Sequence, residues 1–157
     1  FWSMADRPQA LISADGALVG VTVPEGRALS REKGAGFVAG TWLENDGSGH
    51  NQPQAAAFWP ASDAPSIARL AFAGGEIIHL QGKTGSRTWQ GCEAGQIIVS
   101  NVDLDLQGGC LWYDPERLSR TGAIALYATE KGPRLRTDLD LSGHRLWHPE
   151  FSAMAGQ

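Results

Sequence analysis

A chain of 157 residues, 42% of them hydrophobic, is about one domain and can bury a core without a metal or several disulfides. Its net charge of −4 argues against a domain whose main role is to bind nucleic-acid phosphates, because nonspecific nucleic-acid affinity comes chiefly from Lys and Arg. No run approaches the roughly 18 apolar residues of a membrane span, and no signal peptide is visible at the start. We therefore expect residues 1–157 to form a single soluble domain.

The first residues predict that the chain is a C-terminal piece of a longer protein, because an aromatic start is followed by an internal Met4. Aromatic rings favour the membrane–water interface, so Phe1-Trp2 fits the end of a membrane helix that lies at this interface. A local core contact fits these two residues equally well. At the other end, residues 150–157 are expected to fray.

Three short strands are predicted first, at 10–13, 17–23 and 27–30. The turn signals Ala14-Asp15-Gly16 and Pro24-Glu25-Gly26 separate them, which is typical of an antiparallel meander. Bulky residues at helical spacing then predict an amphipathic helix over 37–45. Helix formers before Pro60 predict a second helix over 54–59.

The second half has the pattern of strands separated by turns that mostly contain glycine. The predicted strands are 67–72, 76–80, 96–100, 110–113, 123–127 and 134–138. Asp114-Pro115 is a good helix start, with Asp as N-cap and Pro in the first turn, and this helix should end near Thr121-Gly122. Together the elements predict an α+β domain with a mainly antiparallel β-sheet of short strands and two or three short helices.

Two cysteines, Cys92 and Cys110, lie 18 positions apart. Two readings stay open at this stage, a disulfide and a pair of buried thiols that behave as small hydrophobes. A disulfide would contribute roughly 3 kcal/mol to stability and would place the domain outside the cytosol. A zinc site is not favoured, because neither a C-x-x-C motif nor a nearby Cys/His pair accompanies the cysteines.

Few residues qualify for catalysis or metal binding. His144 and His148 are four apart, and Asp138 and Asp140 are near enough in sequence to complete a metal site. Solvated side chains on a late strand or loop are the simpler interpretation of these four residues. Asp103 and Asp105 (103–105) share a face as a candidate carboxylate pair, with a solvated face as the default.

Other motifs point to structure rather than chemistry. Residues 82–85 resemble the end of a phosphate loop, but the upstream glycine is missing and no helix is expected to begin there. His79 lies within an apolar strand and is expected to be a satisfied sheet residue, whereas His50 lies in a polar loop and should be exposed. No Gly-x-Ser-x-Gly nucleophile elbow is present.

A modest basic cluster is the only residue pattern that indicates nucleic acid. Its members are Arg117, Arg120, Lys131, Arg134 and Arg136. Trp112, Tyr113 and Trp147 lie near them in the sequence, and bases of a single strand stack on aromatic rings beside Arg. Core packing is the competing interpretation of these aromatic residues.

Several segments, in order, resemble a known family. They are 7–21, Cys92 with 97–100, Cys110, 114–118, 121–125 and 143–149. Residues 7–21 look like the segment after the last membrane helices of ComEC-type competence proteins, as found in alphaproteobacteria. The resemblance runs from about Arg7 to Pro149 and depends on order and spacing rather than on a catalytic motif.

This resemblance implies a multi-spanning inner-membrane protein that moves single-stranded DNA into the cell during transformation. It also implies that the present domain lies on the periplasmic side and is related to the metallo-β-lactamase-like domain. Its partners would be the membrane segments of the parent channel and single-stranded DNA, with no dedicated small-molecule ligand.

The sequence departs from that family pattern at one important point. Complete metallo-β-lactamase-like domains carry a His-x-His-x-Asp-His cluster, and no such run occurs in the chain. We therefore expect a degenerate or partial relative with no catalytic residue, no metal and no cofactor. A metal-dependent hydrolase or nuclease remnant and a stand-alone binding module remain the alternative functions.

Overall fold

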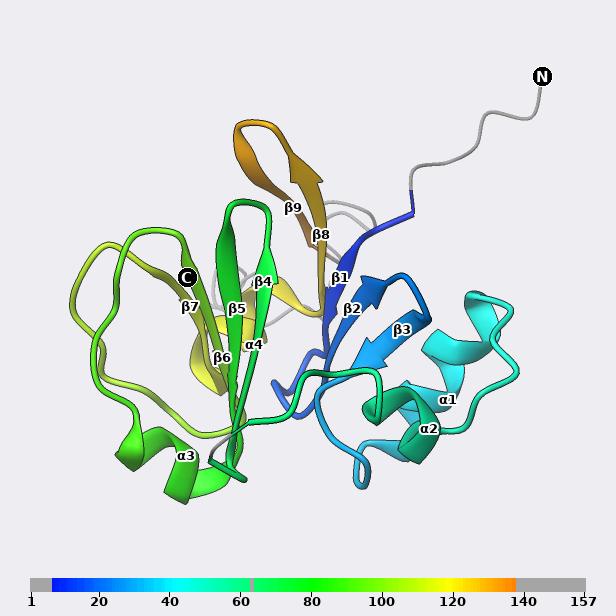
Figure 1. Ribbon diagram of the computed structural model, residues 1–157. Helices are drawn as coiled ribbons and strands as arrows, with labels where there is room; N and C mark the ends of the chain where they lie inside the picture. The colour runs from blue at the N-terminus through cyan, green and yellow to red at the C-terminus, as the bar shows by residue number, and fades with distance from the viewer. Residues whose placement is uncertain (1–6, 63, 138–157) are drawn as a thin grey trace, which may run out of the picture.

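The structure, a computed structural model, describes residues 7–62 and 64–137. Two β-sheets pack against each other in this part of the chain (Figure 1). The five-stranded sheet has the order β3-β2-β1-β8-β9, and the four-stranded sheet has the order β4-β5-β6-β7. The strands of the first sheet are β1 (Ala10–Ile12), β2 (Val19–Val23), β3 (Gly26–Leu29), β8 (Ile124–Thr129) and β9 (Gly132–Thr137). Those of the second are β4 (Ile67–Phe72), β5 (Gly75–Leu80), β6 (Gln96–Ser100) and β7 (Leu111–Tyr113).

The main core lies between the two sheets. Strand residues alternate between the two faces of a sheet, so one side chain in two points inward. The inward side chains include Ile12, Val21, Ile124 and Leu126 from the five-stranded sheet and Leu70, Ile77, Ile97 and Val99 from the four-stranded sheet. Burial of each such aliphatic side chain contributes about 1.5–3 kcal/mol relative to exposure, so this layer is the main source of stability.

Different elements cover the outer faces of the two sheets. Helices α1 (Gly36–Asn45) and α2 (Gln52–Ala56) lie over the β2–β3 side of the five-stranded sheet, around Leu18, Leu29 and Leu43. The outer face of the four-stranded sheet is covered mainly by loop residues, which include Trp89, Leu104, Leu106 and Cys110. No helix in the ranges 7–62 and 64–137 is long and apolar enough to cross a membrane.

The expected α+β class with mainly antiparallel short strands is confirmed. The opening meander forms as β1, β2 and β3, and the late helix is α4 (Pro115–Thr121), capped by Asp114 at one end and Gly122 at the other. Strands β5, β6 and β7 pair in parallel, which the sequence analysis did not anticipate. A parallel pair needs a crossover connection, and the long segment between β5 and β6 contains a fourth short helix, α3 (Gly82–Thr88).

Two helix predictions need correction. Helix α2 begins earlier and ends at Ala56, because Asn51 and Gln54 form a capping box and Trp59 turns into the main core. The second error concerns residues 82–85, where we expected no helix although α3 begins at Gly82. Tertiary contacts explain α3: the Gly82 amide donates to Asn101 Oδ1 at 2.8 Å, and a side chain at Gly85 would collide with the Ser66 carbonyl oxygen.

Gly16 is required where the two sheets meet. Its φ is +71°, and a Cβ there would collide with the carbonyl oxygen of Ser100 at the end of β6. Gly47 has nearly the same φ, +69°, but no atom lies within 4 Å of the position of its Cβ. The two glycines therefore share a backbone conformation and differ in the space around it.

We expect Gly16→Ala to lower the free energy of unfolding by about 3 kcal/mol, because the left-handed conformation and the collision both cost energy. The matched control Gly47→Ala should lose only about 1 kcal/mol from its conformation. Urea unfolding of both variants measures the difference. Equal losses would contradict a close approach of the two sheets at Gly16.

Candidate functional site

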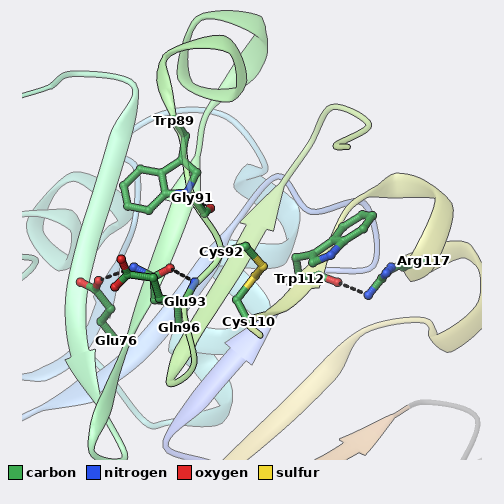
Figure 2. Close-up of a disulfide and its surroundings, with 9 residues drawn as sticks. All are labelled: Glu76, Trp89, Gly91, Cys92, Glu93, Gln96, Cys110, Trp112 and Arg117. Carbon is green, nitrogen blue, oxygen red and sulfur yellow. Dashed lines mark hydrogen bonds between the residues drawn. A yellow bond between two sulfur atoms is a disulfide. The ribbon is translucent and has the colours of Figure 1, made fainter. Parts of the chain in front are cut away.

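The disulfide is present: Cys92 and Cys110 are bonded, with their Cα atoms 4.8 Å apart (Figure 2). The bond joins the loop after α3 to the residue before β7, and the Gly109 amide donates to the Cys92 carbonyl oxygen at 2.9 Å. Cys110 packs on the apolar cluster outside the four-stranded sheet. The open choice between a disulfide and two free thiols is therefore settled in favour of the disulfide.

A polar network surrounds this bond. The Trp89 indole N–H donates to the Gly91 carbonyl oxygen, and Gln96 links Glu76 to the backbone of Glu93 (Figure 2). Three hydrogen bonds from Arg69 to the Glu76 carboxylate hold the pKa of that carboxylate below its ordinary value. The loop that carries Cys92 is thus held by several side chains besides the disulfide.

The first two basic candidates, Arg117 and Arg120 on α4, contact residues close to them in the sequence. The Arg117 guanidinium lies 3.5 Å from the ring centre of Trp112 and donates to the Trp112 carbonyl oxygen (Figure 2). Arg120 pairs with Glu116 one helical turn earlier, at 2.8 Å. Both residues have local structural partners on α4 and β7, which accounts for their positions without a ligand.

The other three candidates lie on the β8–β9 hairpin, which projects from the sandwich in Figure 1. Lys131 is in the turn, and Arg134 and Arg136 are exposed on one face of β9. Arg134 lies over the ring of Tyr127, its partner across the hairpin, at 4.8 Å from the ring centre. The five candidates thus form two groups on different elements.

A groove of about 550 Å³ lies on the outer face of the five-stranded sheet, between the end of α1 and β9. Arg7, Leu11, Trp42, Asp46, Ala125 and Arg136 are among its lining residues. Arg27 at its edge is only 5% exposed and donates to both oxygens of the Asp46 carboxylate, at 2.8 and 3.0 Å. The sequence analysis missed this ion pair and Arg7, although a charged residue within the short strand of 27–30 was a usable signal.

Polar residues also gather at the carboxyl ends of β5, β6 and β7, the edge at which parallel sheets commonly bind ligands. Asp114, after β7, is 1% exposed and accepts from the Arg117 and Leu104 amides at 3.0 and 2.9 Å. Ser100, at the end of β6, bonds Ser86 and both polar groups of the Val102 backbone. These side chains hold loops in place.

His79 is fully buried at this edge, as expected for a satisfied sheet residue. Its Nε2 lies 2.9 Å from the Gly16 carbonyl oxygen, which only accepts, so Nε2 carries the proton. The Ser30 hydroxyl, 2.7 Å from Nδ1, then donates to that nitrogen and also accepts from the Val19 amide. The imidazole is therefore neutral, and burial lowers its pKa from 6.5 to about 4.

The catalytic candidates receive no support from the described residues. Asp103 and Asp105 are exposed, and His50 is exposed beside Ser48 as expected. No group of three His, Cys, Asp or Glu side chains that could hold a metal occurs in the ranges 7–62 and 64–137. Asp138, Asp140, His144, His148 and Trp147, and the tail 150–157, lie outside these ranges.

Comparison of the chain with protein-family models, with curated proteins and with solved structures finds no match. The interpretation of the site therefore rests on its own geometry and chemistry.

We expect His79 to make stability depend on pH between 6.5 and about 4. In this range the unfolded chain binds a proton that the folded protein excludes, so the contribution is fully present above pH 6.5 and is lost as the pH falls through about 4. The loss should reach roughly 3 kcal/mol. Urea unfolding at pH 7.5 and 4.5 should show a smaller pH effect in His79→Gln, and an unchanged pH effect would contradict the buried neutral imidazole.

Removal of the disulfide should lower the free energy of unfolding by roughly 3 kcal/mol. The test compares the Cys92→Ser/Cys110→Ser variant with the oxidised protein in urea unfolding. Mass analysis without reductant provides the control, because the bonded chain is two hydrogens lighter than the reduced chain. Two free thiols in protein made in an oxidising compartment would contradict the pairing.

Proposed function

We propose that this chain is a non-catalytic extracytoplasmic domain of a ComEC-type inner-membrane DNA-uptake protein. The observation that carries the proposal is the Cys92–Cys110 disulfide. Disulfides persist in oxidising compartments such as the periplasm and are rare in the cytosol. The ordered segments from Arg7 to Pro149, with their likeness to ComEC-type proteins, supply the particular family.

The non-catalytic part of the proposal is supported by how the reactive side chains are used. His79 has both ring nitrogens in hydrogen bonds, and its low pKa keeps it neutral at neutral pH. Both oxygens of Asp114 accept backbone amides, so this carboxylate is committed to the start of α4 and to the 101–109 loop. A general base must reach its substrate, and both residues are buried, with exposures of 0% for His79 and 1% for Asp114.

The proposed role is structural, beside the pore or in contact with the DNA that passes through it. A degenerate metallo-β-lactamase-like origin is part of the same proposal, since the family relationship implies it. The domain would have kept a stable two-sheet body and lost its nuclease centre.

The gene that encodes the chain provides the first test, since the proposal requires several membrane spans directly upstream of Phe1. Cells that carry the full parent protein provide the second. Deletion of this domain should lower the frequency of transformation by added DNA at least tenfold. The matched variant Asp103→Asn/Asp105→Asn should transform like the wild type, because we assign these carboxylates no catalytic role.

Three results would overturn the proposal. They are a parent gene without membrane spans, loss of transformation in the Asp103→Asn/Asp105→Asn variant at normal protein level, and stoichiometric metal in the purified protein with metal-dependent cleavage of DNA. The last result would support the hydrolase remnant instead.

A further inference from the structure

The groove on the outer face of the five-stranded sheet has an apolar floor with a cationic border. Strand register places Gly20, Leu11, Ala125 and Arg136 side by side across β2, β1, β8 and β9. Leu11 and Ala125 are both partly exposed, and both line the groove. An apolar strip formed by Leu11 and Ala125 therefore ends at the guanidinium of Arg136 on β9.

The opposite wall exists because residue 20 is glycine. A Cβ at Gly20 would lie 2.9 Å from Cδ of Arg27 and 3.2 Å from the ring of Trp42, so both side chains lie over this position. Trp42 and Asp46 belong to the end of α1, which covers the β2–β3 side of the sheet. The groove therefore runs between an aromatic wall on one side and β9 on the other.

The charge of the groove is opposite to that of the whole chain. Arg7 is 70% exposed and lies 4.0 Å from Asp46, whose two oxygens already accept from Arg27. Arg134 and Arg136 form no ion pair with any residue in the described ranges, and both are exposed. The groove of a chain with a net charge of −4 is thus lined by three arginines, Arg7, Arg27 and Arg136, and a single carboxylate.

Arg134 and Arg136 are two residues apart on β9, so they stand about 7 Å apart on the same face. Successive phosphates of an extended single strand can follow such a row. Tyr127 lies on the same face as Ala125 and carries Arg134 over its ring, which offers a flat cationic surface for a base. Guanidinium groups also bind phosphate through paired hydrogen bonds.

We infer that this groove binds single-stranded nucleic acid, an inference that rests on the proposed function. Arg7 and Arg136 on the groove lining hold phosphates, and Arg134 extends this row along β9 beyond the groove. Unpaired bases lie over Leu11 and Ala125, beside Trp42. A duplex keeps its bases stacked inside and presents only phosphates to such an apolar floor, so it is the poorer ligand. Arg117 and Arg120 do not line the groove and take no part.

The test is fluorescence anisotropy of a labelled (dT)12 oligonucleotide with the 157-residue protein over a range of NaCl concentrations. Three phosphate contacts predict a slope of about −2 for log K against log salt. Arg134→Ala/Arg136→Ala should weaken binding at least tenfold at about 50 mM NaCl and reduce the slope to about −0.7. Lys83→Ala/Arg87→Ala removes the same charge from exposed positions on α3 and should leave both values unchanged.

Circular dichroism and urea unfolding confirm that both variants are folded. The inference is overturned if no binding occurs at low salt, if the two variants lose equal affinity, or if a duplex or a poly-Glu peptide of similar length binds as tightly. Its failure is distinct from failure of the proposed function. If the parent gene encodes membrane spans but the protein does not bind the oligonucleotide, only the binding role of the groove is overturned. If the protein binds the oligonucleotide but the parent gene encodes no membrane spans, only the proposed function is overturned.

Discussion

The hydrogen bonds of His79 fix how the two sheets sit on each other. Hydrophobic contact between two sheets is not directional, so the apolar layer alone allows several alignments of similar energy. The His79 imidazole comes from β5 of one sheet and bonds Ser30 and Gly16, which follow β3 and precede β2 of the other. These bonds are satisfied only in one arrangement, because a shift would leave buried polar groups without partners.

The same packing of the two sheets determines which surfaces are covered and which are open to a ligand. At the carboxyl ends of the parallel strands, where many α/β proteins place their chemistry, the polar side chains hold the sheets and loops together. The disulfide and loop residues cover the outer face of the four-stranded sheet. The β1–β8–β9 side of the five-stranded sheet, bordered on one side by the end of α1, provides the groove.

Features set by neighbouring residues were readable from the sequence. The meander follows from its turn signals, and α4 follows from Asp114-Pro115 at its start and Gly122 at its end. The sequence could not show that the second oxygen of Asp114 accepts from Leu104, because that contact depends on how a distant loop returns. Helix α3 was missed for a related reason: its glycines have low helix propensity, and contacts with Ser66 and Asn101 decide its position.

In the candidate site, too, the sequence revealed individual residues but not the contacts between distant parts of the chain. Five basic residues were found by composition, but only the fold shows that Arg136 lines the groove with Arg134 next to it on β9. It also shows that Arg117 and Arg120 contact Trp112 and Glu116 instead. Arg27 within a short strand was a signal for a buried ion pair, but the sequence could not show that its partner is Asp46 or that Arg7 lies beside the same carboxylate, because these residues are far apart in the chain. The pairing of Cys92 with Cys110 stayed open because spacing along the chain does not give the distance between Cα atoms.

An acidic net charge is compatible with a cationic groove because salt screens the interaction between distant charges. At physiological salt, charges more than about 8 Å apart are largely screened, so acidic residues beyond that distance would have little effect on a phosphate in the groove. Guanidinium groups in direct contact with such a phosphate would act at hydrogen-bond distance and lose much less to screening. The wider acidic surface would reduce nonspecific attraction, and three contacts would give weak, salt-sensitive binding. Weak binding suits a surface past which a strand must move, because a tight complex would hold the strand in place.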